Sequence, residues 1–133
     1  MLHATKRKEL LIITPNEVGA LGKVTGAVSA AGVNFITLSA WGEKDKGYFR
    51  MLTSDNAKAG AGLKKIGYEI NEKDVLLINI GNKPGTLAPI ARKIGEAGIE
   101  INYCYATAWS DMAVLVLSTK NNDKVLSIIT TLP

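Results

Sequence analysis

The chain has 133 residues, of which 47% are hydrophobic, and its formal net charge is +4 at pH 7. Its apolar runs, such as residues 10–13, are far shorter than the ~20 residues of a membrane helix, and no secretory signal is readable. The length allows one ordinary domain or two very small ones that pack together and share a core. We therefore expect a cytoplasmic protein that does not enter a membrane.

Charge and cysteine content exclude further classes of protein. The lysines are scattered, and their one cluster, residues 6–8, falls in a segment expected to be a tail. Nucleic-acid binders concentrate basic residues on one face and interleave aromatic residues, so no nucleic-acid partner is expected. The single cysteine, Cys104, excludes an internal disulfide and a CxxC metal or redox site, and we expect its side chain to be buried.

The sequence repeats itself at an offset of 66 residues. Gly85 follows Gly19 by 66 positions, and Gly98 follows Gly32 by the same distance. The match runs without a gap from Thr14 and its counterpart, and apolar runs on both sides keep the offset. We interpret this as a duplication, with one repeat at residues 1–72 and the other at residues 73–133.

Each repeat predicts the same series of elements. Apolar residues alternate or cluster in the strands, and they recur at helical spacing from Leu21 and from Leu87. The first repeat is expected to contain a strand at residues 8–14, a helix ending at Gly32, a hairpin at residues 34–41 and 46–53, a helix at residues 56–66 and a strand at residues 68–71. The second is expected to contain a strand at residues 74–80, a helix ending at Gly98, a hairpin at residues 100–109 and 111–118, and a helix at residues 123–130.

The element order predicts an α+β fold made of two ferredoxin-like βαββαβ repeats. Each antiparallel sheet has its helices on one face. In the second repeat the sequence passes from the last helix directly to Leu132 and Pro133, so the matching fourth strand is missing. The sequence does not show what covers the sheet edge that this strand would occupy, and an uncovered edge would invite pairing with another chain.

The turn that opens each repeat's first helix resembles the signature of the ACT domain. In the second repeat it reads Asn82-Lys83-Pro84-Gly85-Thr86-Leu87, and its helix ends in Ala97-Gly98-Ile99. The first repeat has a looser version, Asn16-Glu17-Val18-Gly19-Ala20-Leu21, with a helix ending in Ala31-Gly32-Val33-Asn34. The chain thus resembles a tandem pair of ACT domains without an enzyme attached. The resemblance implies a non-catalytic regulatory protein that binds a small metabolite, commonly an amino acid, where two repeats meet.

The resemblance also implies which residues hold the ligand. The turns supply backbone N–H groups, and the start of the second strand supplies a polar side chain. The expected ligand-binding residues are Asn16, Glu17, Val18, Gly19, Ala20, Leu21 and Asn34 in the first repeat, and Asn82, Lys83, Pro84, Gly85, Thr86, Leu87 and Asn102 in the second. Glu100 occupies the position equivalent to Asn34, and Asn102 lies two residues on, on the same face of a regular strand. Independently, a helix N-terminus suits a carboxylate, and a glycine leaves the backbone approachable.

No group of residues predicts catalysis, a cofactor or a metal. The sequence around Gly22-Lys23 lacks the remaining residues of a phosphate-binding loop, and His3, the one histidine, falls in the expected tail. Trp41 and Trp109 are expected in core or interface packing, with a ligand wall as the alternative. We expect a homodimer. The alternative function is a regulatory subunit or interaction module that docks on a metabolic enzyme through the uncovered edge.

Overall fold

The computed structural model describes residues 2–132, so the outermost residues of the two predicted repeats, Met1 and Pro133, lie outside it. In chain order the elements are β1 (His3–Pro15), α1 (Ala20–Ala30), β2 (Phe35–Glu43), β3 (Lys46–Thr53), α2 (Asn56–Lys65), β4 (Glu69–Gly81), α3 (Ala88–Glu96), β5 (Ile101–Trp109), β6 (Met112–Thr119) and α4 (Asn122–Thr130). The longest helix, α1, has 11 residues, and no helix in the described chain is both long and apolar enough to cross a membrane.

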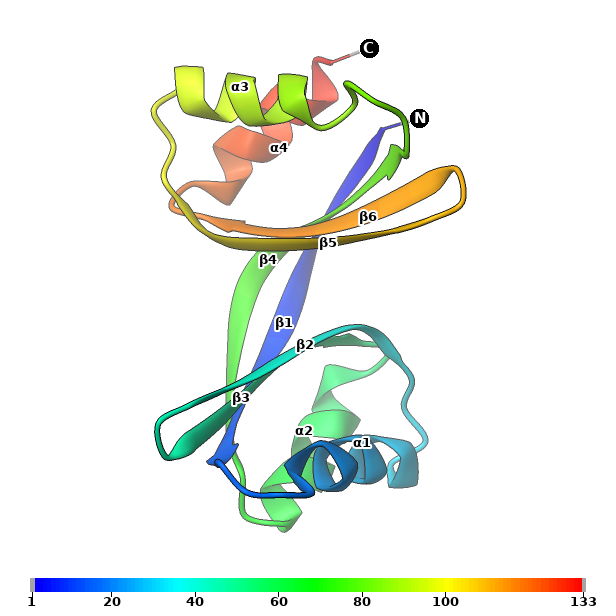
Figure 1. Ribbon diagram of the computed structural model, residues 1–133, viewed down its shortest axis with the longest axis vertical. Helices are drawn as coiled ribbons and strands as arrows, with labels where there is room; N and C mark the ends of the chain where they lie inside the picture. The colour runs from blue at the N-terminus through cyan, green and yellow to red at the C-terminus, as the bar shows by residue number, and fades with distance from the viewer. Residues whose placement is uncertain (1, 133) are drawn as a thin grey trace. The chain divides into compact units, whose positions relative to one another are not determined.

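The chain forms two compact units, and both contain part of β1 and part of β4 (Figure 1). The first unit is Lys8–Lys73, and the second unit combines residues 2–7 with residues 74–132. Hydrogen-bonded neighbours follow the order β2-β3-β1-β4-β6-β5. The first unit therefore uses β2-β3-β1-β4 and the second uses β1-β4-β6-β5, which is the same ferredoxin-like order.

The position of the missing fourth strand is occupied by the start of the chain. No strand follows α4 in the described residues, but residues 3–7 of β1 belong to the second unit, where β1 neighbours β4. Leu2 and Ala4 pack against the core of this unit, and Lys6 Nζ lies 2.7 Å from Asp123 Oδ1. The start of β1 therefore covers the edge beside β4, which the sequence alone had left open. The expectation of a tail at His3 and residues 6–8 was wrong for the same reason.

Both shared strands are longer than the sequence predicts. β1 and β4 each have 13 residues, whereas the predicted strands were residues 8–14, 68–71 and 74–80. The last two are one continuous strand, because the charged residues Lys73 and Asp74 do not interrupt β4.

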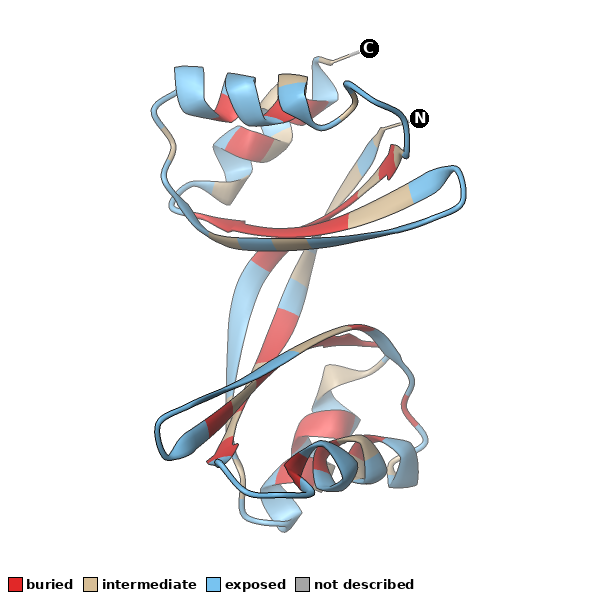
Figure 2. Ribbon diagram, in the orientation of Figure 1, coloured by how far each residue is buried: buried red, intermediate tan, exposed pale blue. Residues whose placement is uncertain are grey.

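In the first unit, α1 and α2 cover one face of the sheet (Figure 1). Residues of these helices and strands are buried there, as the red segments of Figure 2 show, and their apolar side chains form one core. The core consists of Leu10, Ile12, Ala20, Val24, Val28, Val33, Phe49, Met51, Ala59 and Leu63. Leu21, expected on the apolar stripe of this helix, is instead 53% exposed.

The second unit repeats this arrangement with α3 and α4. Its core consists of Leu76, Ile78, Ile80, Ile90, Ile94, Leu115, Leu117, Val125 and Ile129. Leu87 precedes the first residue of α3 and is 41% exposed, so the predicted core position of both leading leucines was wrong. Leu21 is the second residue of α1 and Leu87 belongs to the turn before α3, and neither side chain lies on the helix face that packs.

The hairpins of the two units have the same turn length and the same irregularity in strand pairing. Their two-residue turns begin at Lys44 and Ser110, both with a φ of 57°. The strand pairing shifts register between Phe35 and Thr37 in β2, and at the equivalent place, around Asn102, in β5. The prediction that Asn102 shares a face with Glu100 assumed a regular strand. The register shift shows that the strand is irregular at Asn102.

Candidate functional site

The two turns expected to bind a ligand each contain a glycine with a positive φ. Gly19 has a φ of 89° and Gly85 a φ of 84°, a region that residues with a Cβ rarely adopt. A Cβ built on either glycine would meet no atom within 4 Å in the described structure. The glycines are thus required by the turn conformation and not by crowding, and the backbone beside them is open to an approaching molecule.

The helices that follow these turns differ from the other two helices in capping. The side chains of Asp55 and Asn121 cap α2 and α4 by accepting hydrogen bonds from Lys58 N and Lys124 N. Within the described chain, no side chain caps α1 or α3, and neither helix has an acidic residue in its first turn. Unpaired N–H groups and a partial positive charge at these two N-termini favour an anion or a carboxylate.

Each turn is fixed to the hairpin of its own unit by an asparagine. Asn16 Nδ2 donates to the main-chain oxygen of Lys44 at 3.1 Å, and Asn82 Nδ2 donates to that of Ser110 at 2.9 Å. The backbone N–H groups of both asparagines also donate to the hairpin turns, to Asp45 and Asp111, at 2.9 Å. The two asparagines therefore have a structural role that sequence reasoning did not foresee, and each keeps its side-chain oxygen as an acceptor.

In the second unit the turn borders a hollow of ≈ 340 Å³. The predicted residues that line it are Asn82, Lys83, Gly85, Thr86 and Leu87, and Pro84 is not among them. Ala106, Thr107 and Ala108 of β5 also line it. Sequence reasoning missed these three residues, and their small size is the one signal that could have suggested an open space next to the turn.

The turn of the first unit has a different charge arrangement. Glu17 accepts hydrogen bonds from Lys23 Nζ at 3.1 Å and from the Tyr68 hydroxyl at 3.3 Å. The hydrogen bond to Glu17, together with its negative charge, raises the pKa of Lys23 above its ordinary value. Burial raises the pKa of Tyr68. At the position of Glu17 the second unit has Lys83, so the second turn is the more favourable one for a carboxylate.

The polar residues expected at the start of the second strands do not lie beside the turns of their own units. Asn34 follows the C-terminal end of α1, whose 11 residues extend over about 16 Å. It lines a separate hollow of ≈ 530 Å³ with Gly22 and Gly26 of α1. Asn102 likewise follows α3, and its Nδ2 donates to Ser118 Oγ at 3.1 Å. The turn and the asparagine of the same unit thus adjoin opposite ends of the helix, and the binding role of both asparagines stays a prediction.

Other side chains singled out in the sequence are placed as follows. Cys104 is exposed, which contradicts its expected burial. Trp41 stacks on Tyr48 with ring centroids 5.4 Å apart, whereas Trp109 is 87% exposed and is not part of a core. Within residues 2–132, no three His, Cys, Asp or Glu side chains form a group that could hold a metal ion.

Comparison with known proteins identifies the family. A family model described as the ACT domain pair matches residues 6–132. The chain belongs to this family. The ACT pair thus accounts for nearly all of the sequence given, in agreement with the resemblance of the two turns. No curated protein matches the sequence.

Solved structures agree with this assignment. Protein BT0572 from Bacteroides thetaiotaomicron is 30% identical, with a TM-score of 0.89 over 96% of this chain and 89% of that one. The ligand-free regulatory subunit of aspartate kinase from Thermus thermophilus is 12% identical, with a TM-score of 0.73 over 98% and 95% of the two chains. Aspartokinase III of E. coli, in complex with lysine and aspartate, is 11% identical, with a TM-score of 0.61 over 98% of this chain and 32% of that one. At these identities the last two share the ACT-pair fold.

Proposed function

We propose that this ACT pair is a non-catalytic regulatory protein that binds an amino acid at the turns formed by residues 16–21 and 82–87. The observation that carries the proposal is the pair of uncapped helices, α1 and α3, each entered through a glycine with a positive φ. The other two helices of the described chain, α2 and α4, are capped by side chains. Among these four helices, only α1 and α3 therefore have uncapped N-termini.

The chemistry of the turns suits the two charged groups of an amino acid. Free N–H groups at a helix start bind a carboxylate, and in the second unit Lys83 adds a positive charge. The side-chain oxygen of Asn82 can accept a hydrogen bond from an ammonium group, because only its Nδ2 is used by Ser110. The hollow of ≈ 340 Å³ falls at the lower end of the range for small-molecule sites, about 300–1,000 Å³. It therefore favours a small ligand.

The solved structures support a regulatory role by analogy. The protein from Thermus thermophilus is a regulatory subunit, and the E. coli enzyme was solved with lysine and aspartate. Both share the fold with this chain and little of its sequence, so neither specifies the amino acid. We propose the ligand class from the turn geometry and leave its side chain open to experiment.

A thermal-shift screen against the twenty common amino acids at millimolar concentration tests the proposal. A ligand present at about 100 times its dissociation constant stabilises the folded protein by about 2.7 kcal/mol, a clear shift for units of this size. We expect one amino acid, or a few of similar structure, to stabilise the protein. If none does so, the amino-acid proposal fails.

A second candidate function is that of a regulatory subunit that docks on a metabolic enzyme. The edge beside β4 no longer motivates it, but β2 is an outermost strand, and Phe35 and Ile36 on it are 56% and 44% exposed. Apolar side chains on an edge strand favour pairing with another chain. Affinity purification from the source cells that returns no stoichiometric enzyme would contradict this candidate. Sedimentation equilibrium of the same sample would test the expected homodimer.

A further inference from the structure

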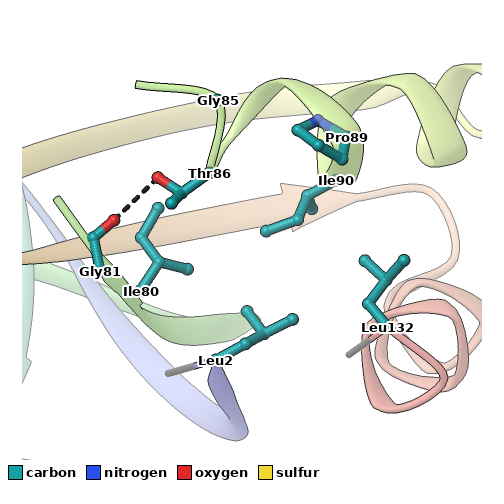
Figure 3. Close-up of a pocket in the computed structure, with 8 residues that line it drawn as sticks. All are labelled: Leu2, Ile80, Gly81, Gly85, Thr86, Pro89, Ile90 and Leu132. Carbon is teal, nitrogen blue, oxygen red and sulfur yellow. Dashed lines mark hydrogen bonds between the residues drawn. The ribbon is translucent and has the colours of Figure 1, made fainter. Parts of the chain in front are cut away.

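The second unit contains an apolar pocket separate from the hollow beside β5. Its volume is ≈ 260 Å³, and Figure 3 shows it between the start of β1, the end of β4, the N-terminal part of α3 and the segment after α4. The side chains that line it are Leu2, Ile80, Thr86, Pro89, Ile90 and Leu132. An apolar cavity of about 150 Å³ can bind benzene, so this pocket has room for a somewhat larger apolar body.

The one polar side chain in this lining is already hydrogen-bonded. Thr86 Oγ1 donates to the main-chain oxygen of Gly81 at 2.8 Å (Figure 3) and also lies 3.0 Å from that of Lys83. A guest in the pocket therefore meets mainly aliphatic carbon. This lining favours an aliphatic group and disfavours a polar one, whose hydrogen bonds to water would be lost without replacement.

At the equivalent place in the first unit, two side chains, those of Lys23 and Tyr68, make hydrogen bonds to Glu17. The 66-residue offset places Tyr68 at the position of Leu2, and Lys23 at that of Pro89. Tyr68 packs against the core of the first unit, and its hydroxyl reaches Glu17, which also binds Lys23. We call Glu17, Lys23 and Tyr68 the closing cluster.

The second unit lacks the closing cluster at all three positions. Leucine replaces the tyrosine and has no hydroxyl, proline replaces the lysine, and Lys83 replaces the glutamate. No ring therefore extends from the sheet to the turn. The difference between the two units coincides with an open apolar pocket in the second one.

We propose that the pocket of the second unit binds the aliphatic body of a small molecule, a group of about five or six carbons. The two possible sources of this body are a free aliphatic compound and the side chain of an aliphatic amino acid. Gly85 and Thr86 line both the pocket and the hollow beside the turn, so the second source would join the pocket to the proposed amino-acid site. The pocket itself does not depend on that site.

Methyl-detected NMR of the full chain tests the proposal with isoamyl alcohol as the probe. We expect the alcohol to shift the methyl signals of Ile80, Ile90 and Leu132 in the wild-type protein. Leu2→Tyr introduces into the second unit the residue that the first unit has at the equivalent position, Tyr68. Its ring should fill the pocket and weaken the affinity for the alcohol at least about tenfold. Leu132→Trp is an independent filling variant with the same expectation, and thermal melts show whether both variants are folded. Absence of any shift at these methyls, or equal shifts in wild-type and folded filled variants, overturns the proposal.

The reciprocal variant Tyr68→Leu removes the ring from the closing cluster. In this variant the alcohol should shift the methyl signals of Val24 in the first unit. In the wild-type protein we expect no such shift. An unchanged Val24 signal in folded Tyr68→Leu, at alcohol concentrations that saturate the wild-type pocket, would contradict the role given to the closing cluster.

Leucine and glycine distinguish the two sources and separate this proposal from the proposed function. If leucine shifts the pocket methyls together with the backbone amides of residues 82–87, the body belongs to an amino acid. If isoamyl alcohol shifts the pocket methyls and neither amino acid shifts the turn amides, the aliphatic group comes from a free compound. The pocket then binds its ligand although the turn binds no amino acid. Glycine, which has no aliphatic body, should leave the pocket methyls unchanged, and a shift there equal to that of leucine contradicts the assignment.

Discussion

The side-chain amide of Asn82 donates a 2.9 Å hydrogen bond to the main-chain oxygen of Ser110, 28 residues further along the chain. Asn16 and Lys44 make the same contact in the first unit, over the same sequence separation. In both units an asparagine thus connects the turn before the helix to the tip of the hairpin. The connection fixes the position of the turn relative to the hairpin.

Asn82→Ala should destabilise the second unit by about 1 kcal/mol, the usual net contribution of one hydrogen bond. Urea denaturation followed by hydrogen exchange of amides in α3 and β6 measures this loss. Asn16→Ala is the matched control, because it should produce a similar loss confined to the first unit. If neither variant changes the free energy of unfolding, the two contacts do not stabilise the turns.

Ala4→Asp should selectively destabilise the second unit. Ala4 packs against the core of that unit, so a charged side chain there costs at least about 1 kcal/mol. Hydrogen exchange of Val125 and Ile129, two core residues of α4, measures the effect. His3→Asp is the control, since His3 is exposed on the same strand and should tolerate the charge. Equal effects of the two substitutions would show that the start of β1 does not complete the sheet of the second unit.

Gly85→Ala and Gly95→Ala should change stability in opposite directions. A Cβ at position 85 has free space but meets a φ of 84°, which costs about 1–2 kcal/mol. Gly95 lies within α3, where alanine also has free space and raises stability by roughly 0.5–1 kcal/mol. Thermal or urea unfolding of both variants gives the comparison. A stabilising Gly85→Ala would mean that the turn does not need its positive φ.

Lys83→Glu should weaken the binding of an amino acid by about tenfold, which corresponds to about 1.4 kcal/mol. The substitution places a negative charge beside the N-terminus of α3, where a carboxylate is expected to bind. Lys93→Glu makes the same change of charge in the last turn of α3 and should leave the affinity unchanged. Calorimetric titration with the amino acid that stabilises the protein measures both affinities, and equal losses would indicate a general effect of net charge.

The sequence predicted all ten elements at least in part, with β4 divided into two strands, because the apolar residues of the strands and helices follow regular spacing. It did not predict the strand at residues 3–7, since His3, Thr5 and Lys6 give that segment no apolar pattern. This segment is a strand because β4 pairs with it and because Leu2 and Ala4 reach a core formed mainly by residues 76–129. The 66-residue offset, which places residues 2–7 on residues 68–73, was the available signal.

The turns of the candidate site were predictable because Gly19 and Gly85 mark them at a constant offset. Their surroundings were not, since those depend on contacts between distant segments. Asn82 meets the hairpin 28 residues away, and Ala106–Ala108 also line the hollow. Leu87 was misplaced because helical spacing alone does not show that it precedes the first residue of α3.

The most direct test of the proposed function is a backbone-amide NMR titration with each of the twenty amino acids at millimolar concentration. The uncapped helix starts predict that at least one amino acid shifts the amides of Gly85, Thr86 and Leu87, the residues that lead into α3. The same amino acid should stabilise the protein against heat. If no amino acid shifts the amides of either turn, or if the shifts lie only in other parts of the chain, the turns are not the binding site and the central claim is wrong.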